Sequence, residues 1–280
     1  MQSVAIIGAG ELGGAVAHVL ARRDVARSIA LIDESGRVAS GKALDIAQAA
    51  PVEGFATQLT GSTDISHAAG ASVVIIADRF TGAELQGDEG LLMLKRLTQI
   101  AAGAVVLCAG AAQRELVDRG IRDLKFGRTR LFGSAPEALA NGARALTALA
   151  VNGSPRDVAL SVLGVPPSHM VIPWADATIA GFSLTRLLDE PSRHRLAARV
   201  TALWPPGPYA LASAAVLVLE AMSGRTRRIA SCFVAPDTSA GTRTRTAALP
   251  VRLSASGISE VLVPSLSVVE NIALENAMLL

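Results

Sequence analysis

The stretch VAIIGAGELGG, Val4 to Gly14, decides the fold of this chain. Four apolar residues predict a buried strand, three glycines spaced as G-x-G-x-x-G predict a tight turn, and the apolar periodicity of 15–21 predicts a helix. Backbone N–H groups at the start of such a helix can bind a diphosphate. Gly10 has no Cβ to block the approach of this ligand, and Gly13 lets the helix pack closely on the strand.

An acidic residue follows the next predicted strand. Asp33 comes directly after the apolar run 29–32, twenty residues beyond Gly13. A carboxylate there can accept hydrogen bonds from both ribose hydroxyls and would repel a 2′-phosphate, so NAD is preferred over NADP. Alternatively, Asp33 caps the next segment and the turn belongs to a Rossmann-like domain without a nucleotide. The predicted cofactor-binding residues are Gly8, Gly10, Glu11, Leu12, Gly13 and Asp33.

Composition indicates a globular protein without a general attraction to polyanions. Half of the 280 residues are hydrophobic, and 26 Lys and Arg stand against 24 Asp and Glu. A net charge of +2 gives no argument for nucleic acid or an anionic membrane as a partner. The longest apolar run, 210–219, is too short to span a bilayer. Cys108 and Cys232 lie in apolar runs, which indicates buried free thiols and the cytoplasm. The cysteines and four scattered histidines lack the spacing of a metal site.

Strand and helix patterns alternate along the first half of the chain. The strand patterns lie at 57–60, 71–77, 104–108 and 131–132, and the helical patterns between them at 41–49, 91–101 and 113–119. This alternation predicts an α/β fold with a doubly wound parallel sheet. The first of these helices is expected to end before Pro51, because proline disrupts a helix interior.

From residue 134 the pattern becomes that of a second, α+β domain. A single apolar strand is expected at 158–163, and alternating stretches at 229–235 and 247–253 suggest an antiparallel pair. The expected helices of this part lie at 137–151, 192–203, 210–222 and 267–280. We therefore predict a Rossmann NAD-binding domain over residues 1–133 and a C-terminal domain over residues 134–280.

Several short runs carry a resemblance to known proteins. They are GAGELG at 8–13, LID at 31–33, GKALDI at 41–46, ASVVII at 71–76 and MVIP at 170–173. With these runs the chain resembles the lactate and malate dehydrogenase family over essentially its whole length, and GKALDI is much like malate dehydrogenases of the bacterial type. The resemblance implies a Rossmann domain that binds NAD, a C-terminal substrate domain, a homodimer or homotetramer, and reversible oxidation of a 2-hydroxy acid to a 2-keto acid.

The positions that carry the family's chemistry hold other residues here. The family has its general base in a G-x-H-G-D segment, and GVPPSHMV at 164–171 aligns with this segment so that Pro166 stands at the His. On the preceding helix, Leu139 stands at the Asp that holds the base and Gly142 at the Arg that binds the substrate carboxylate. Loss of such a relay usually lowers the rate by several orders of magnitude, which argues against ordinary malate or lactate turnover.

The segments around the cofactor and substrate also depart from the family. Gly82 and Asp88 fall at the usual arginines of the loop that closes over the substrate, and Cys108 falls at the Asn that orients substrate and ribose. Asp78 and Arg79 stand where small residues usually lie close to the cofactor diphosphate.

Three functional hypotheses follow. The first is an oxidoreductase with an altered substrate, in which His169 is a weak candidate for the catalytic base and Arg79 supplies a different cation. The second is a non-catalytic NAD-binding sensor or partner subunit. The third is a structural or interaction protein that keeps the fold alone.

Overall fold

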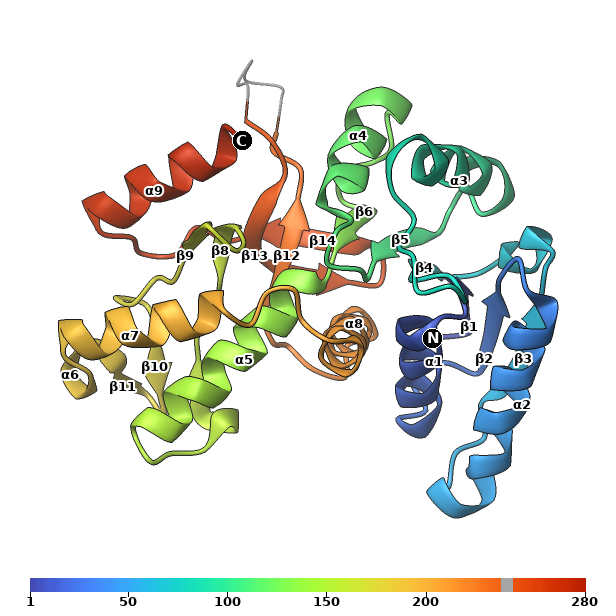
Figure 1. Ribbon diagram of the computed structural model, residues 1–280, viewed down its shortest axis with the longest axis horizontal. Coiled ribbons are helices and arrows are strands. Elements are labelled where there is room, and N and C mark those ends of the chain that lie inside the picture. The colour runs from blue at the N-terminus through green and yellow to red at the C-terminus, as the bar shows by residue number, and fades with distance from the viewer. Residues whose placement is uncertain (238–243) are drawn as a thin grey trace.

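A sheet that runs through the molecule organises the computed structural model, which describes residues 1–237 and 244–280 (Figure 1). Its N-terminal half is parallel, in the order β3-β2-β1-β4-β5-β6. These strands are β1 Ser3–Ile7, β2 Ser28–Ile32, β3 Gln58–Ser62, β4 Val73–Ile76, β5 Val105–Cys108 and β6 Leu131–Gly133. The predicted α/β class and doubly wound sheet are confirmed. The strand order reverses between β1 and β4, which is where ligands bind in such sheets.

Helices cover both faces of this parallel sheet. They are α1 Glu11–Arg22, α2 Gly36–Glu53, α3 Gly87–Ile100 and α4 Arg114–Leu124, with a short 3₁₀ helix at Ile65–Ala68. Side chains alternate along β1, so Val4 and Ile6 pack in the core that includes α1, and Ala5 and Ile7 pack in the core that includes α3 and α4. In Figure 1, α3 and α4 lie above the sheet and α1 lies below it.

The C-terminal part adds antiparallel strands to the same sheet. The strands are β8 Leu163–Val165, β9 His169–Val171, β12 Ala230–Val234, β13 Ala247–Ser254 and β14 Gly257–Val261. The predicted antiparallel pair is confirmed, with Cys232 opposite Leu249. Because Phe233 of β12 pairs with Gly133 of β6, the sheet continues across the predicted domain boundary. The division after residue 133 stays a prediction.

Most of the remaining elements form a second layer around the long helix α5 Ala135–Ala150. They are β7 Val158–Ala159, β10 Thr178–Ile179, β11 Phe182–Ser183, α6 Leu184–Leu187, α7 Glu190–Thr201 and α8 Pro208–Met222, with a 3₁₀ turn at Pro155–Asp157. Helix α9 Val268–Met278 packs instead on β8 and β9. Helix α8 packs on α1 and on α5, and it is apolar enough to be buried along most of its length. It thereby joins the two halves of the molecule through one continuous apolar core.

Two expectations about single elements were wrong. Helix α2 passes through Pro51 and ends at Gly54, whose φ of 77° is left-handed. Pro51 lies in the last turn, so it removes little of the helical hydrogen bonding. The expected strand 158–163 is two strands, because β7 pairs with β10 in a small three-stranded sheet and β8 pairs with β13 in the large one.

Both cysteines are free and buried, as predicted. Within residues 1–237 and 244–280, no helix is both long and apolar enough to cross a membrane, and no three His, Cys, Asp or Glu side chains are grouped to hold a metal ion.

Candidate cofactor site

The predicted cofactor residues lie at the carboxyl ends of two neighbouring strands, and Asp78 and Arg79 lie at the end of a third. The glycine turn 8–13 follows β1, Asp33 follows β2, and Asp78 and Arg79 follow β4. Because β1 pairs in parallel with both β2 and β4, these ends lie side by side at the point where the strand order reverses. Glu11 alone is turned outward: it is exposed on the first turn of α1 and lines a separate cavity.

The N-terminus of α1 already holds an anion that belongs to the chain. The Asp78 carboxylate accepts hydrogen bonds from the backbone N–H of Gly13, at 2.9 Å, and from that of Leu12, at 3.2 Å. The residue that precedes the helix, Gly10, provides no side-chain cap, and Asp78 is 7% exposed. Asp78 therefore satisfies the N–H groups that the sequence predicts for a diphosphate, and it complements the positive end of the helix dipole.

The glycines of the turn permit contacts within the chain. A Cβ on Gly10 would lie 2.2 Å from the Arg79 carbonyl oxygen and 2.4 Å from the Asp78 carboxylate, and a Cβ on Gly8 would lie 2.2 Å from the Asp78 carbonyl oxygen. A Cβ on Gly13 would lie 2.1 Å from the carbonyl oxygen of Gly8, so its role in close packing of helix on strand is the predicted one. In this structure the backbone that approaches Gly10 is that of residues 78–79.

Asp33 is also hydrogen-bonded within the chain. One carboxylate oxygen accepts the N–H of Ala9, at 2.7 Å, and that of Phe80, at 3.0 Å, while the other accepts the N–H of Ser35, also at 3.0 Å. A carboxylate offers about four acceptor positions, so these three donors leave room for one further hydrogen bond. Asp33 as arranged here cannot accept from both hydroxyls of a ribose.

Residues 78–84 form a small hairpin across the site, which we call the 78–84 hairpin. Asp78 and Glu84 form an antiparallel bridge, and the N–H of Arg79 donates to the carbonyl of Ala83, at 2.9 Å. The Glu84 carboxylate accepts the N–H of Ala111, at 3.0 Å, and that of Ala112, at 2.9 Å, just beyond the end of β5. The hairpin thus places one carboxylate on backbone N–H groups beyond β1 and another on those beyond β5, the two strands that flank β4.

Burial changes the pKa of the Glu84 carboxylate, which contacts the N–H groups of Ala111 and Ala112. It raises the pKa of Glu84, against the opposing effect of the two N–H groups, and the nearby charge of Asp78 raises the pKa further. Burial likewise raises the pKa of the Cys108 thiol far above its usual range, so this cysteine at the end of β5 is an apolar core residue rather than a nucleophile.

A cavity of about 450 Å³ remains open beside Asp33. It lies between the end of β1, the residues after β3 and the start of α3, and the Arg79–Glu89 ion pair lines one side of it. Its floor includes Ile7 and Leu85, which are apolar and buried. The cavity has room for a ligand of nucleoside size next to the Asp33 carboxylate.

Comparison with known proteins identifies the fold and its ancestry. Residues 2–86 match the family model of the lactate/malate dehydrogenase NAD binding domain. The malate dehydrogenase of Thioalkalivibrio sulfidiphilus is 31% identical over 208 residues, which cover 71% of this chain and 68% of that protein. The chain belongs to the lactate/malate dehydrogenase family. The malate dehydrogenase of Thermomicrobium roseum is 27% identical over 99% of this chain and 94% of its own length.

Solved structures extend this likeness to the whole dehydrogenase fold. The malate dehydrogenase of Salinibacter ruber matches with a TM-score of 0.84 and 26% identity, over 99% of this chain and 94% of that one. A Cryptosporidium parvum lactate dehydrogenase, solved with lactic acid and NAD, matches with a TM-score of 0.88 over the same shares of the two chains, and its 19% identity shows the fold alone. By family, the chain is an NAD-binding oxidoreductase of the malate and lactate type.

The three residues that the sequence analysis aligns with the family's catalytic Asp, Arg and His are Leu139 and Gly142 on α5 and Pro166 after β8, and none of them is ionisable. Leu139 is 1% exposed and packs in an apolar cluster with residues of α7. Gly142 faces Leu203, whose side chain would lie 2.6 Å from a Cβ added there. Pro166 is buried and precedes a cis peptide bond to Pro167. His169 is exposed on β9, opposite Val165.

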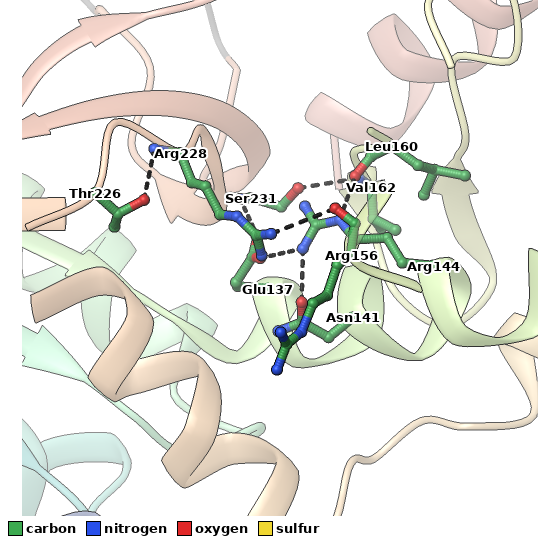
Figure 2. Close-up of polar contacts among 9 residues, drawn as sticks. All are labelled: Glu137, Asn141, Arg144, Arg156, Leu160, Val162, Thr226, Arg228 and Ser231. Carbon is green, nitrogen blue, oxygen red and sulfur yellow. Dashed lines mark hydrogen bonds and ion pairs between the residues drawn. The ribbon is translucent and has the colours of Figure 1, made fainter. Parts of the chain in front are cut away.

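The one arginine of α5 near these positions, Arg144, has a structural role (Figure 2). Its guanidinium donates to the Leu160 carbonyl at 3.0 Å and to Asn141 at 2.6 Å, and it forms an ion pair with Glu137, which is fully buried. The second oxygen of Glu137 accepts the N–H of Ser231 at 2.7 Å. Through these contacts Arg144 ties α5 to the segment before β8, and its partner Glu137 ties α5 to β12.

Sequence reasoning missed Glu84 and the Glu137–Arg144 pair as organising residues. A signal for the pair exists, because a Glu and an Arg seven residues apart on one helix lie on the same face. No sequence signal indicates that Glu84 reaches Ala111 and Ala112, since this contact depends on the tertiary positions of β4 and β5.

Proposed function

We propose that this member of the dehydrogenase family binds a nicotinamide dinucleotide without turning over malate or lactate. The observation that carries the proposal is the absence of ionisable side chains at Leu139, Gly142 and Pro166, where the family has its Asp, Arg and His. Hydride transfer from a 2-hydroxy acid needs a base for the hydroxyl proton and a cation for the carboxylate, and neither is present at these positions.

The nicotinamide dinucleotide is the cofactor that the family membership of residues 2–86 favours. Asp33 supports NAD over NADP, because its carboxylate would repel a 2′-phosphate. The Cryptosporidium parvum lactate dehydrogenase was solved with lactic acid and NAD, and we propose the same class of dinucleotide for this chain without the hydroxy acid chemistry.

The alternative is an oxidoreductase with an altered substrate and His169 as its base. Among the described residues, the structure gives His169 no carboxylate partner that would orient its ring, whereas a catalytic histidine is normally held by a third group. This geometry favours the non-catalytic proposal.

We also propose a cytoplasmic homo-oligomer. Two buried free cysteines support a reducing compartment. Apolar side chains on the outer face of α2, among them Leu44 and Val52, are largely exposed and support a homodimer or homotetramer in which they are covered.

Turnover decides between these functions. The chain and the Salinibacter ruber malate dehydrogenase would be assayed together for NADH oxidation with oxaloacetate, pyruvate and a panel of other 2-keto acids. We expect rates at least about a thousandfold below that enzyme on every substrate. A rate within tenfold of it on oxaloacetate or pyruvate would refute the proposal. Turnover of another keto acid that disappears in His169→Ala would establish the alternative.

A further inference from the structure

We propose that the 78–84 hairpin is an internal plug of the cofactor site, with the Asp78 carboxylate held where a dinucleotide places its diphosphate. The inference rests on the proposed nucleotide binding and adds its regulation: the chain as described is the closed state, and a dinucleotide binds only when Asp78 leaves the start of α1. Ligand binding and movement of the hairpin are therefore one coupled event.

The first step of the argument is competition for the same donors. The diphosphate of a dinucleotide is bound by backbone N–H groups at the N-terminus of the first helix. Here those of Leu12 and Gly13 donate to Asp78, and the N–H of Gly10 donates to the Asp78 carbonyl at 3.0 Å. Two anions cannot occupy these donors together, because their charges repel and the atoms would overlap.

The second step is that the 78–84 hairpin also contacts Asp33 and the residues beyond β5. The hairpin reaches Asp33 through the N–H of Phe80 and reaches the end of β5 through Glu84. The three anchoring points lie at the ends of β1, β2 and β5, which together span the crevice that a dinucleotide follows. The hairpin thus occupies the crevice as one unit.

The third step is that the crevice is not filled in by side chains of the core. The cavity of about 450 Å³ beside Asp33 stays open, and the hairpin forms one of its walls through Arg79. The structure therefore combines an open space of nucleoside size with a blocked anion position, which is the arrangement expected of a site that is closed by a removable segment.

The direct test measures NADH binding by titration calorimetry in four proteins. They are the wild type, Asp78→Ala, Asp78→Asn, and Asp123→Ala as a matched control, because Asp123 is an exposed carboxylate at the far end of α4. We expect Asp78→Ala to bind NADH at least about tenfold more tightly than the wild type, Asp78→Asn to lie between them, and Asp123→Ala to stay within about twofold of the wild type. The Asn variant keeps the size of the side chain, so it serves if the Ala variant does not fold.

Failure of the plug is distinct from failure of the proposed function. If Asp78→Ala and Asp78→Asn bind NADH no better than an Asp123→Ala control that does bind it, the plug alone is refuted. If none of the four proteins binds NADH, the proposed nucleotide binding is refuted as well. If the wild type turns over oxaloacetate at a normal rate, the proposed function is refuted by that assay alone.

Hydrogen exchange gives a second readout on the wild type. At saturating NADH we expect the amides of Arg79 and Phe80 to exchange faster, because their hydrogen bonds to Ala83 and Asp33 are released. NADH binding that leaves the exchange of residues 78–84 unchanged would overturn the coupling.

Discussion

The Asp78 carboxylate lies 2.9 Å from the backbone nitrogen of Gly13, sixty-five residues away in the chain. A side chain at the end of β4 therefore caps the helix that follows β1. A cap formed by a residue next to α1 in the sequence would make the stability of the helix independent of distant segments. Because Asp78 forms this cap, the stability of α1 depends on the position of the 78–84 hairpin.

Removal of this cap is expected to weaken the fold while it opens the site. Asp78→Ala leaves the N–H groups of Leu12 and Gly13 without their acceptor, and we expect the free energy of unfolding to fall by about 1–2 kcal/mol. Denaturant unfolding of this variant beside Asp123→Ala measures the difference. An unchanged free energy of unfolding would show that the carboxylate does not stabilise the helix.

The close approach at Gly10 predicts a large effect of one methyl group. Gly10→Ala places a Cβ against the Arg79 carbonyl and the Asp78 carboxylate, so the backbone must move and we expect a loss of about 2 kcal/mol. Gly41 is the control, because no atom lies within 4 Å of a Cβ added there and Ala favours a helix more than Gly does. Gly41→Ala should be stabilising by up to about 1 kcal/mol, and equal effects of the two substitutions on thermal unfolding would contradict the geometry.

Loss of the buried Glu137–Arg144 ion pair on α5 should lower the free energy of unfolding far more than loss of an exposed ion pair. Arg144→Met leaves the Glu137 carboxylate buried without its cation, and we expect the free energy of unfolding to fall by about 3 kcal/mol or more. Arg252 and Glu260 form an exposed pair, and Arg252→Met should change stability by less than about 1 kcal/mol. Chemical denaturation compares the two, and losses of similar size would mean that the pair on α5 is not structurally important.

A carboxylate at position 139, which the sequence analysis aligns with the family's Asp, should destabilise the protein. Leu139→Asp places a carboxylate in an apolar cluster, and we expect a loss of about 3 kcal/mol or more, whereas Leu139→Met should cost less than about 1.5 kcal/mol. Thermal unfolding measures both. If Leu139→Asp is as stable as Leu139→Met, the packing around this position still admits the family's carboxylate.

Glu84 predicts a specific dependence of stability on pH. Burial raises its pKa above the ordinary value of 4.5, so the folded chain binds this proton more tightly than the unfolded chain does. The free energy of unfolding therefore falls as the pH rises through the interval between these two pKa values, because there the folded state still holds a proton that the unfolded state has released.

Glu84→Gln removes this titration. The free energy of unfolding of the wild type, relative to that of Glu84→Gln, should decrease as the pH rises above the ordinary pKa of 4.5. The groups that face Glu84 are Asp78, Cys108 and the N–H groups of Ala111 and Ala112, and all of them are kept in the variant. Glu115→Gln, at an exposed position, is the control. Parallel pH curves for wild type and Glu84→Gln would contradict the assignment.

The sequence was sufficient for the parallel half of the sheet, because all of its strands except β3 contain short apolar runs that alternate with helical patterns. It was not sufficient at Pro51 or at 158–163. In both places residues outside the local pattern decide the structure. Helix α2 continues past the proline and ends at Gly54, and the apolar run 158–163 contributes strands to two different sheets.

The glycine turn and Asp33 lie together at one crevice, where the sequence predicted them. The sequence could not specify what fills this crevice. Glycines such as Gly8, Gly10 and Gly13 indicate that some group comes close to the backbone. This group can be a ligand or, as here, residues 78–79 of the same chain. The change from small residues to Asp78 and Arg79 was the only local sign of the difference.

Asp78 is part of the same chain as the N–H groups of Leu12 and Gly13, and it competes with a ligand for them. Dilution, dialysis or purification therefore cannot remove this competing carboxylate. Its effective concentration at the start of α1 is set by the length and stiffness of the chain alone. Every ligand that needs these N–H groups then has its apparent affinity lowered by one common factor, the fraction of molecules in which the hairpin is displaced. The selectivity among such ligands is left to the cavity beside Asp33.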